Sequence, residues 1–208
     1  MDATQLGLFV AATLLLNITP GPDMLYTIAN GVQRGPLAAA VSAFGIGLGA
    51  VFHAAMASLG VAALIAASDM AFDILRIAGA AYLIWIGVKS FWSRSAVDPS
   101  APLKNISYSR LFLRGLLTNI LNPKVILFFV ALLPQFVDPL TENISLWLFA
   151  MGCFVGLSGT VINSLVGIIA GGAGKLFMQN PKFQKWIDRV TGSLFISLGI
   201  RLFLVERN

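Results

Sequence analysis

Long apolar runs recur along the whole chain, and each is close to the roughly 20 residues that an α-helix needs to cross about 30 Å of hydrocarbon. Charged residues make up only 11% of the 208 positions, against roughly 25% in a soluble domain. A water-soluble globular protein is therefore excluded, and the sequence predicts an all-α membrane protein with six transmembrane helices. The expected spans cover residues 6–29, 38–67, 71–92, 111–135, 144–172 and 186–205.

The Lys and Arg residues near the span ends predict an orientation, because basic residues beside short loops stay on the cytoplasmic side. Ten of them flank the first, third and fifth connections, whereas the opposite side has three bases and six acids. We therefore expect both termini to lie outside the cytoplasm. The basic residues behind the net charge of +5 lie mostly next to the expected spans, where they would contact membrane lipids. The charge therefore needs no nucleic-acid partner, and none is expected.

The second half of the chain repeats patterns of the first half. Spans three and six carry Arg, Gly, an aromatic residue, Gly, a base and Phe in the same order, in residues 76–91 and 189–203. Spans one and four both contain Asn-Ile followed by Pro. The matched positions in the other four spans are Gly49 with Gly159, His53 with Asn163, Asn17 with Asn119, and Pro20 with Pro123.

Each half contains three spans, and with an odd number of spans the second half enters the membrane from the opposite side. The sequence therefore predicts two inverted repeats, of about residues 1–95 and 108–208, in one transmembrane domain with a cytoplasmic linker at about 93–109. Inverted repeats are typical of secondary transporters, in which two related halves rock around a central site.

Spans one and four are both interrupted by proline near their midpoints. The apolar run of residues 6–18 would extend only about 20 Å as a helix, so the span must continue through Pro20 and Pro22. Proline removes a backbone donor, and irregular backbone is tolerated in hydrocarbon only where protein buries it or where it lines a polar cavity. Broken spans at matching positions of two halves point to a transport site.

Each interruption carries a charge, Asp23 in span one and Lys124 in span four. Two charges at the bilayer centre cost roughly 5 to 7 kcal/mol together unless they are paired or hydrated. One explanation is structural: an ion pair, or Asp23 in the first turn of a half-helix that begins at Pro22. The functional explanation is that both charges face a small cavity between the breaks.

Such a cavity would suit a small zwitterionic amino acid. Lys124 and the N–H groups at the half-helix N-termini would bind the carboxylate, and Asp23 would bind the ammonium group or carry a coupling proton. The candidate substrate-binding residues are Asn17, Thr19, Pro20, Gly21, Pro22, Asp23, Asn119, Asn122, Pro123 and Lys124.

His53 is the only histidine and falls within span two. Its titration range makes it, with Asp23, a candidate proton carrier, and an interhelical hydrogen bond is the alternative role. Glycines gather on spans two and five. They favour close helix packing, and the same faces would serve a homodimer equally well.

Residues 156–159 (GLSG) resemble the nucleophile motif of rhomboid intramembrane proteases, with Ser158 as the nucleophile. A serine nucleophile needs a positioned base, and the rhomboid histidine follows the serine, whereas His53 precedes it. Cys153 is the only cysteine, which excludes dithiol chemistry.

The stretches 17–23 (NITPGPD), 79–87 (GAAYLIWIG) and 122–124 (NPK) resemble the LysE/RhtB family of bacterial amino-acid exporters over essentially the full length. The resemblance implies a six-span protein of the bacterial inner membrane that exports amino acids or close metabolites by proton antiport. It implies no enzymatic activity and no cofactor. The wider superfamily also resembles cation-efflux proteins, so metal export is an alternative, although one His, one Cys and one intramembrane acid supply few ligands.

Overall fold

The computed structural model describes residues 3–61, 106–138 and 141–171 continuously, and isolated positions between 70 and 88 and between 185 and 203. Several predicted parts of the chain lie largely outside the described residues. They are spans three and six, whose sequences match each other, most of the linker at 93–109, and both chain ends.

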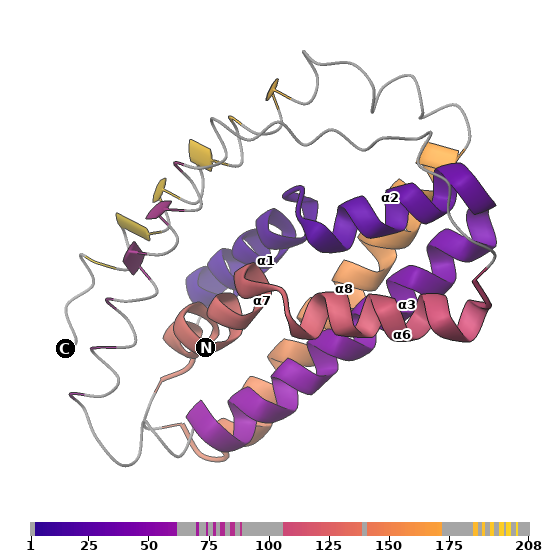
Figure 1. Cartoon of the computed structure of the whole chain (residues 1–208). Helices are drawn as coiled ribbons and strands as arrows, with labels where there is room; N and C mark the ends of the chain where they lie inside the picture. Colours follow the sequence, from indigo (N-terminus) through magenta and orange to yellow (C-terminus); the bar gives the residue numbers. More distant parts are fainter. Residues whose placement is uncertain are drawn as a thin grey trace.

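The described part of the chain is entirely helical, as the sequence predicts (Figure 1). Proline opens three of its α-helices, which suits the first helical turn because the missing N–H has no partner there. The elements are α1 (Ala3–Ile18), α2 (Pro22–Arg34), α3 (Pro36–Met56), η1 (Ala57–Val61), α6 (Tyr108–Ile120), α7 (Pro123–Leu127), η2 (Phe128–Leu132), η3 (Leu133–Phe136) and α8 (Ile144–Gly171).

Two of these helices are long and apolar enough to cross a membrane without a break, at Pro36–Gly60 and Ile144–Gly171. Two further segments qualify as bent pairs: α1 with α2, at 50°, and α6 with Pro123–Phe136, at 49°. The described residues therefore hold two to four candidate spans. The predicted helical class and the breaks in spans one and four are confirmed, and α8 begins at Ile144, the predicted start of the fifth span.

The two breaks arise from local sequence. The carbonyl of Leu16 would normally accept a hydrogen bond from the N–H of residue 20, but residue 20 is proline and has no N–H. In the second break, α6 ends at Ile120 and the side chain of Asn122 accepts a 3.1 Å hydrogen bond from the backbone N–H of Lys124, which caps α7. Because α2 begins at Pro22 and α7 at Pro123, Asp23 and Lys124 are each the second residue of a half-helix.

Helices α3 and α8 run antiparallel through the centre of the described fold. A Cβ atom built on Gly167 would lie 2.8 Å from the Cβ of Ala39 at the start of α3, whereas one on Gly152 would lie 2.5 Å from the Cβ of Ala54 near its end. Each long helix also contacts a broken span of the other half of the chain, because α3 packs against α6 and α8 packs against α2. The broken spans are thus held on a central antiparallel pair.

Glycine sets the distance between this central pair and the broken spans that pack on it. A Cβ on Gly45 of α3 would collide with the carbonyl of Phe112 in α6, and a Cβ on Gly171 of α8 would lie 2.5 Å from the carbonyl oxygen of Gly31 in α2. Only a residue without a side chain lets the backbones come this close.

Aromatic side chains fill one end of the central pair. Phe9 of α1 packs edge-on against Phe136 of η3, with ring centroids 5.6 Å apart. Phe128 and Phe129 of η2 belong to the same cluster and are 1% exposed. Leu148 and Met151, in the first half of α8, are buried in the same cluster.

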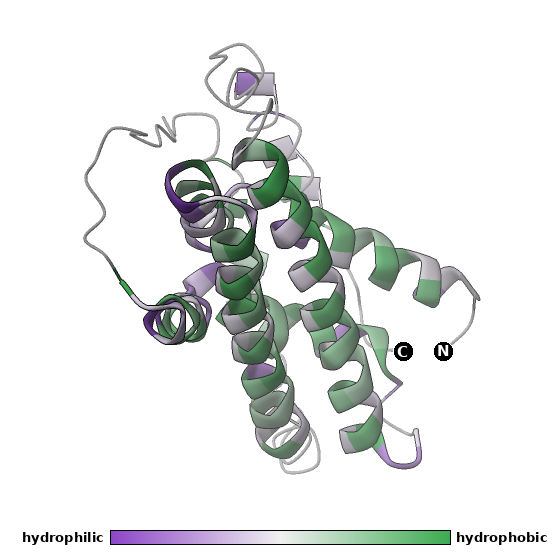
Figure 2. Cartoon of the chain, turned by 90° about the vertical axis from the view of Figure 1, so that its right-hand side faces the viewer, coloured by the Kyte–Doolittle hydropathy of each residue, from purple (hydrophilic) through white to green (hydrophobic). Residues whose placement is uncertain are grey.

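The long helices consist largely of apolar residues, as the green along their ribbons in Figure 2 shows, and several of the large apolar side chains are exposed. Phe44 of α3 and Leu157 of α8 are each 68% exposed. A water-soluble protein rarely exposes contiguous apolar surface of this extent. These faces are suited to contact with lipid.

Candidate functional site

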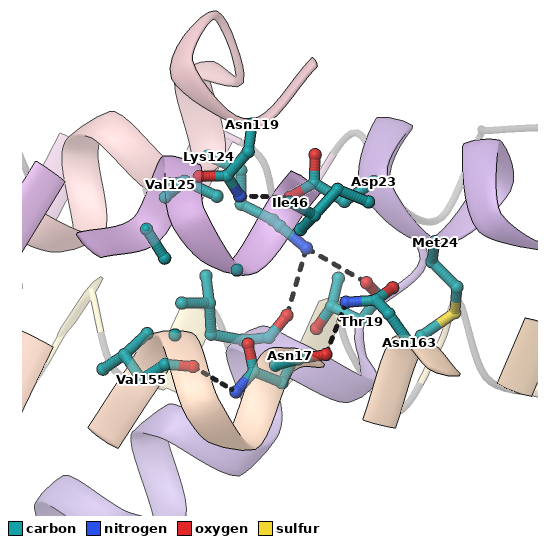
Figure 3. Close-up of a pocket in the computed structure, with 15 residues that line it drawn as sticks. Asn17, Thr19, Asp23, Met24, Ile46, Asn119, Lys124, Val125, Val155 and Asn163 are labelled. Atoms are coloured by element: carbon teal, nitrogen blue, oxygen red, sulfur yellow. Dashed lines mark hydrogen bonds between the residues drawn. The ribbon is translucent and has the colours of Figure 1, made fainter. Parts of the chain in front are cut away.

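A polar pocket lies where the two breaks meet, between α1, α2, α3, α6, α7 and α8 (Figure 3). It has about 20 Å³ of free volume, which is room for about one water molecule. Polar side chains from both halves of the chain share its wall with small and aliphatic residues. The lining residues are Leu16, Asn17, Thr19, Asp23, Met24, Ile46, Gly47, Ala50, Asn119, Lys124, Val125, Val155, Gly156, Gly159 and Asn163.

Of the ten substrate-binding candidates from the sequence, half line this pocket: Asn17, Thr19, Asp23, Asn119 and Lys124. The other half, Pro20, Gly21, Pro22, Asn122 and Pro123, belongs to the breaks and their first turns and is absent from the lining. The two predicted segments therefore lie around one pocket, while the prolines and Asn122 belong to the backbone around it.

Lys124 completes the hydrogen bonding of the first broken span. Its ammonium nitrogen Nζ donates to the carbonyl oxygens of Leu16 and Thr19, each at 3.0 Å. The Leu16 carbonyl is the group that Pro20 leaves without a helical partner. The C-terminal end of a helix also favours a positive charge. A cation from one half of the chain thus stabilises the break in the other half.

Asp23 faces the same pocket without pairing with Lys124. Its Oδ2 atom accepts a 2.7 Å hydrogen bond from the side-chain amide of Asn119, and its buried Oδ1 atom has no hydrogen-bond partner. Within the described residues, no ion pair joins Asp23 to Lys124. Asp23 lies in the first turn of α2, where the helix dipole favours a carboxylate.

The two asparagines that precede the breaks make matching contacts. A Cβ on Gly159 of α8 would lie 2.9 Å from Oδ1 of Asn17, and a Cβ on Gly49 of α3 would lie 2.7 Å from Oδ1 of Asn119. Each asparagine therefore packs on a glycine of the long helix from the other half of the chain. The amide of Asn17 also donates a 3.0 Å hydrogen bond to the hydroxyl of Ser158.

His53 lies outside the pocket lining. Its Nε2 atom is 3.3 Å from the carbonyl oxygen of Asn119, and its ring centroid is 5.6 Å from that of Phe129 and 5.9 Å from that of Phe52. The histidine joins α3 to the end of α6, which is the interhelical hydrogen bond that the sequence left open as an alternative role.

Asn163 is a pocket residue that the sequence analysis did not include in the site. Its side-chain amide donates a 2.9 Å hydrogen bond to the carbonyl of Gly159 in its own helix, while its Oδ1 atom is buried without a partner. A signal was available, because Asn163 is polar within an apolar span and occupies the repeat position of His53.

Other chemistry suggested by the sequence finds no support around Ser158. Its hydroxyl donates a 2.7 Å hydrogen bond to the carbonyl of Phe154 in its own helix, and its partner across the helix interface is the amide of Asn17, which is not a base. Across the described ranges, no three His, Cys, Asp or Glu side chains come close enough together to hold a metal ion.

The described helices form candidate spans that are long and apolar enough to cross a membrane, and two of these spans are broken around one pocket that holds an acid and a base. This combination is typical of membrane transport proteins. The chain belongs to the LysE type translocator family, whose sequence profile matches residues 14–206. This is a family of efflux transporters and not of enzymes, so the resemblance noted in the sequence is confirmed and the serine-protease alternative is wrong.

The matches with relatives cover almost the whole chain. It is 33% identical to the membrane protein YrhP of Bacillus subtilis, over 93% of this chain and 95% of the relative. It is 31% identical to the homoserine/homoserine lactone efflux protein of Salmonella typhi, over 93% of each chain. It is also 31% identical to the threonine efflux protein of Escherichia coli K12, over 90% of this chain and 91% of the relative. No solved structure matches the fold.

Proposed function

We propose that this protein exports a small amino acid across the bacterial cytoplasmic membrane in exchange for protons, with the substrate held between the two helix breaks. The single observation that carries the proposal is the pocket itself. It places a carboxylate, an ammonium group and three amide side chains together where both broken spans are interrupted. The names of the relatives, which include efflux proteins for homoserine and homoserine lactone, for threonine and for leucine, support a small amino acid as the substrate.

The ends of a zwitterion match the charges of the pocket. Asp23 binds the ammonium group, with Asn17, Thr19 and Asn119 supplying polar contacts around it. Lys124 binds the carboxylate, because a charge-assisted hydrogen bond is roughly twice as strong as a neutral one. The remaining candidates, Pro20, Gly21, Pro22, Asn122 and Pro123, keep the backbone open so that the substrate meets polar groups at the bilayer centre.

Transport proceeds by alternating access between two inverted three-span repeats, at about 1–95 and 108–208, with both termini outside the cytoplasm. The matching contacts of Asn17 with Gly159 and of Asn119 with Gly49 support this architecture, as does the antiparallel arrangement of α3 and α8. The two charges, Asp23 and Lys124, also occupy equivalent positions of their half-helices.

Proton coupling uses Asp23 and His53. The two groups contact opposite ends of one residue, since the Asn119 side chain donates to Asp23 and its carbonyl contacts His53. A change in the protonation of either group therefore alters the hydrogen bonding at the end of α6, which is also the wall of the pocket.

The test is transport by purified protein in liposomes loaded with radiolabelled L-threonine or L-homoserine. Asp23→Asn and Lys124→Gln should each lower the flux at least about tenfold, the effect of losing one charge-assisted hydrogen bond. Lys185→Gln is the matched control, because Lys185 is exposed. Wild-type flux in both pocket variants, correctly inserted, contradicts the site; no flux of either amino acid in the native protein contradicts the substrate class.

A further inference from the structure

The geometry points to an ammonium subsite in the first break, formed by the carbonyl oxygens of Leu16 and Thr19 and bordered by Asn163. We propose that Lys124 fills this subsite between transport events and that the amino group of the substrate replaces it. The inference rests on the proposed function, which it deepens by naming the group that the substrate must present and the side chain that it must displace.

The two carbonyls form a place for an ammonium group because their helical partners are missing. Pro20 cannot donate to Leu16, and the chain turns into α2 after Thr19. Lys124 Nζ lies 3.0 Å from both oxygens. An –NH₃⁺ group has three donors in a tetrahedral arrangement, and a substrate ammonium group is the same chemical group on a different molecule.

The pocket cannot hold an amino acid while Lys124 stays in this position. Its free volume of about 20 Å³ accepts one water molecule, and an amino acid is several times larger. A Cβ on Gly21 would lie 3.1 Å from Nζ, so the ammonium group also closes the space beside the break. The side chain of Lys124 is flexible and its charge is a compact point, so it is the group best able to move.

Hydrogen-bond acceptors are in excess around the pocket. The Oδ1 atoms of Asp23, Asn119 and Asn163 are buried without partners, and the three residues are 7%, 3% and 5% exposed. Among the described lining residues no buried side-chain nitrogen lacks a partner, and the amide nitrogen of Asn122, just outside the lining, is the single unpaired buried side-chain nitrogen of the described residues against these three oxygens. A site with this imbalance favours a cation that brings several N–H donors.

A zwitterion can both replace Lys124 at the carbonyls and provide the displaced Lys124 with a counter-ion. Its ammonium group replaces that of Lys124 at the Leu16 and Thr19 carbonyls, with Asp23 of the same pocket as its counter-ion. The displaced ammonium group of Lys124 then binds the substrate's carboxylate. A ligand with a carboxylate alone would leave two carbonyls buried without donors. A ligand with an ammonium group alone would free Lys124 without giving it a counter-ion. The subsite therefore selects compounds in which a primary ammonium group and a carboxylate, or another acceptor, lie on neighbouring carbons.

The test uses the full-length protein in detergent and methylammonium as the probe. Lys124→Ala removes the internal ammonium group and should lower the midpoint of thermal unfolding by about 4 °C or more, because two buried carbonyls lose their donor. Methylammonium chloride should restore part of this loss in Lys124→Ala and leave the wild type unchanged. Lys185→Ala, at an exposed position, should show neither effect.

Two salts separate an ammonium subsite from a general effect of charge. Tetramethylammonium carries the same charge without N–H donors, and sodium is a hard cation of the kind that oxygen ligands bind. Neither should stabilise Lys124→Ala. Equal stabilisation by tetramethylammonium or sodium overturns the proposal, as does the absence of any response to methylammonium.

A second variant keeps the test valid if Lys124→Ala does not fold. Gly21→Ala places a methyl group against Nζ, whereas Gly7→Ala in α1 has nothing within 4 Å of the added atom. Gly21→Ala should raise the labelling of Lys124 by a small amine-reactive reagent several-fold relative to Lys185, measured by mass spectrometry. Gly7→Ala should leave this ratio unchanged, and equal ratios in the two variants contradict the displacement.

These measurements need no transport, so the two proposals fail separately. If methylammonium stabilises Lys124→Ala but no amino acid is carried, the subsite stands and the exporter assignment falls. If threonine is carried by the wild type while methylammonium has no effect on the variant, the exporter assignment stands and the subsite falls.

Discussion

Lys124 Nζ and the Thr19 carbonyl oxygen lie 3.0 Å apart, although the residues are separated by 105 positions in the chain. The contact joins the second broken span to the first. A second hydrogen bond also joins the two spans: the side-chain amide of Asn119, at the end of α6, donates to Asp23 at the start of α2. Neither break is therefore complete alone, and a displacement of one broken span must change the hydrogen bonding of the other.

Neutralising Asp23 should remove transport and spare the fold. In Asp23→Asn a side-chain oxygen still accepts from Asn119, so the midpoint of unfolding should change little, while the flux of L-threonine in liposomes falls at least about tenfold. Glu142→Gln serves as the control because Glu142 is exposed. A large loss of stability together with the loss of flux would instead assign Asp23 a structural role.

Adding one methyl group at either matched glycine should destabilise the protein. Gly49→Ala would press on Asn119 and Gly159→Ala on Asn17, and overpacking of this kind costs about 1 to 3 kcal/mol. Gly60→Ala has nothing within 4 Å of the added atom and should be neutral. Unfolding in detergent measures the three variants, and losses of similar size at Gly49 and Gly159 are expected from their equivalent contacts.

Replacing Asn163 with an apolar residue of similar size should separate stability from transport. The Oδ1 atom of Asn163 is buried without a partner, and removing such a group is neutral or stabilising. Asn163→Leu should therefore keep or raise the unfolding midpoint, while the KM for L-threonine rises several-fold. An unchanged KM would place Asn163 outside the ammonium subsite.

His53 should be replaceable without loss of the fold if the new side chain can still donate to Asn119. His53→Gln retains a donor near that carbonyl but cannot carry a proton in the physiological pH range. We expect threonine to flow down its gradient at nearly the wild-type rate, while proton flux measured with a pH dye inside the liposomes decreases. Undiminished proton flux would leave Asp23 as the sole carrier.

The predicted orientation can be checked with single cysteines in a Cys153→Ala background. A cysteine at Ser107, before α6, should react with a membrane-impermeant reagent only from the cytoplasmic side. A cysteine at Glu142, in the connection before α8, should react only from outside. Both positions are exposed. The reverse pattern would overturn the assignment of both termini to the outer side.

The helical class and the position of both breaks could be predicted from the sequence because they depend on local properties. The length of an apolar run decides whether a helix can cross, and the missing N–H of Pro20 and Pro123 interrupts the helix wherever it is placed. The match between Asn17 and Asn119 also placed two residues of one pocket in register. No tertiary information was needed for these conclusions.

The partners of the charged groups could not be predicted in this way. Charge alone suggests that Asp23 and Lys124 attract each other, but the ammonium group instead bonds to two carbonyls. Pro20 indicates that the Leu16 carbonyl lacks a helical partner, but nothing in the sequence indicates that Lys124 is the group that reaches it. The place of His53 beside the pocket depends on the packing of Phe52 and Phe129 around its ring. Asn163 lines the pocket because α8 packs against α1 and α2, and which helices pack against each other cannot be read from the sequence of α8.

The helix contacts made through glycine and those made through aromatic rings differ in kind. A Cβ on Gly45 would meet the carbonyl of Phe112, and one on Gly171 the carbonyl of Gly31. Backbone therefore packs directly on backbone there, and these helices can separate only by moving as whole helices. Phe9 and Phe136 instead make contact through their rings, so this interface depends on the rotamers of two side chains.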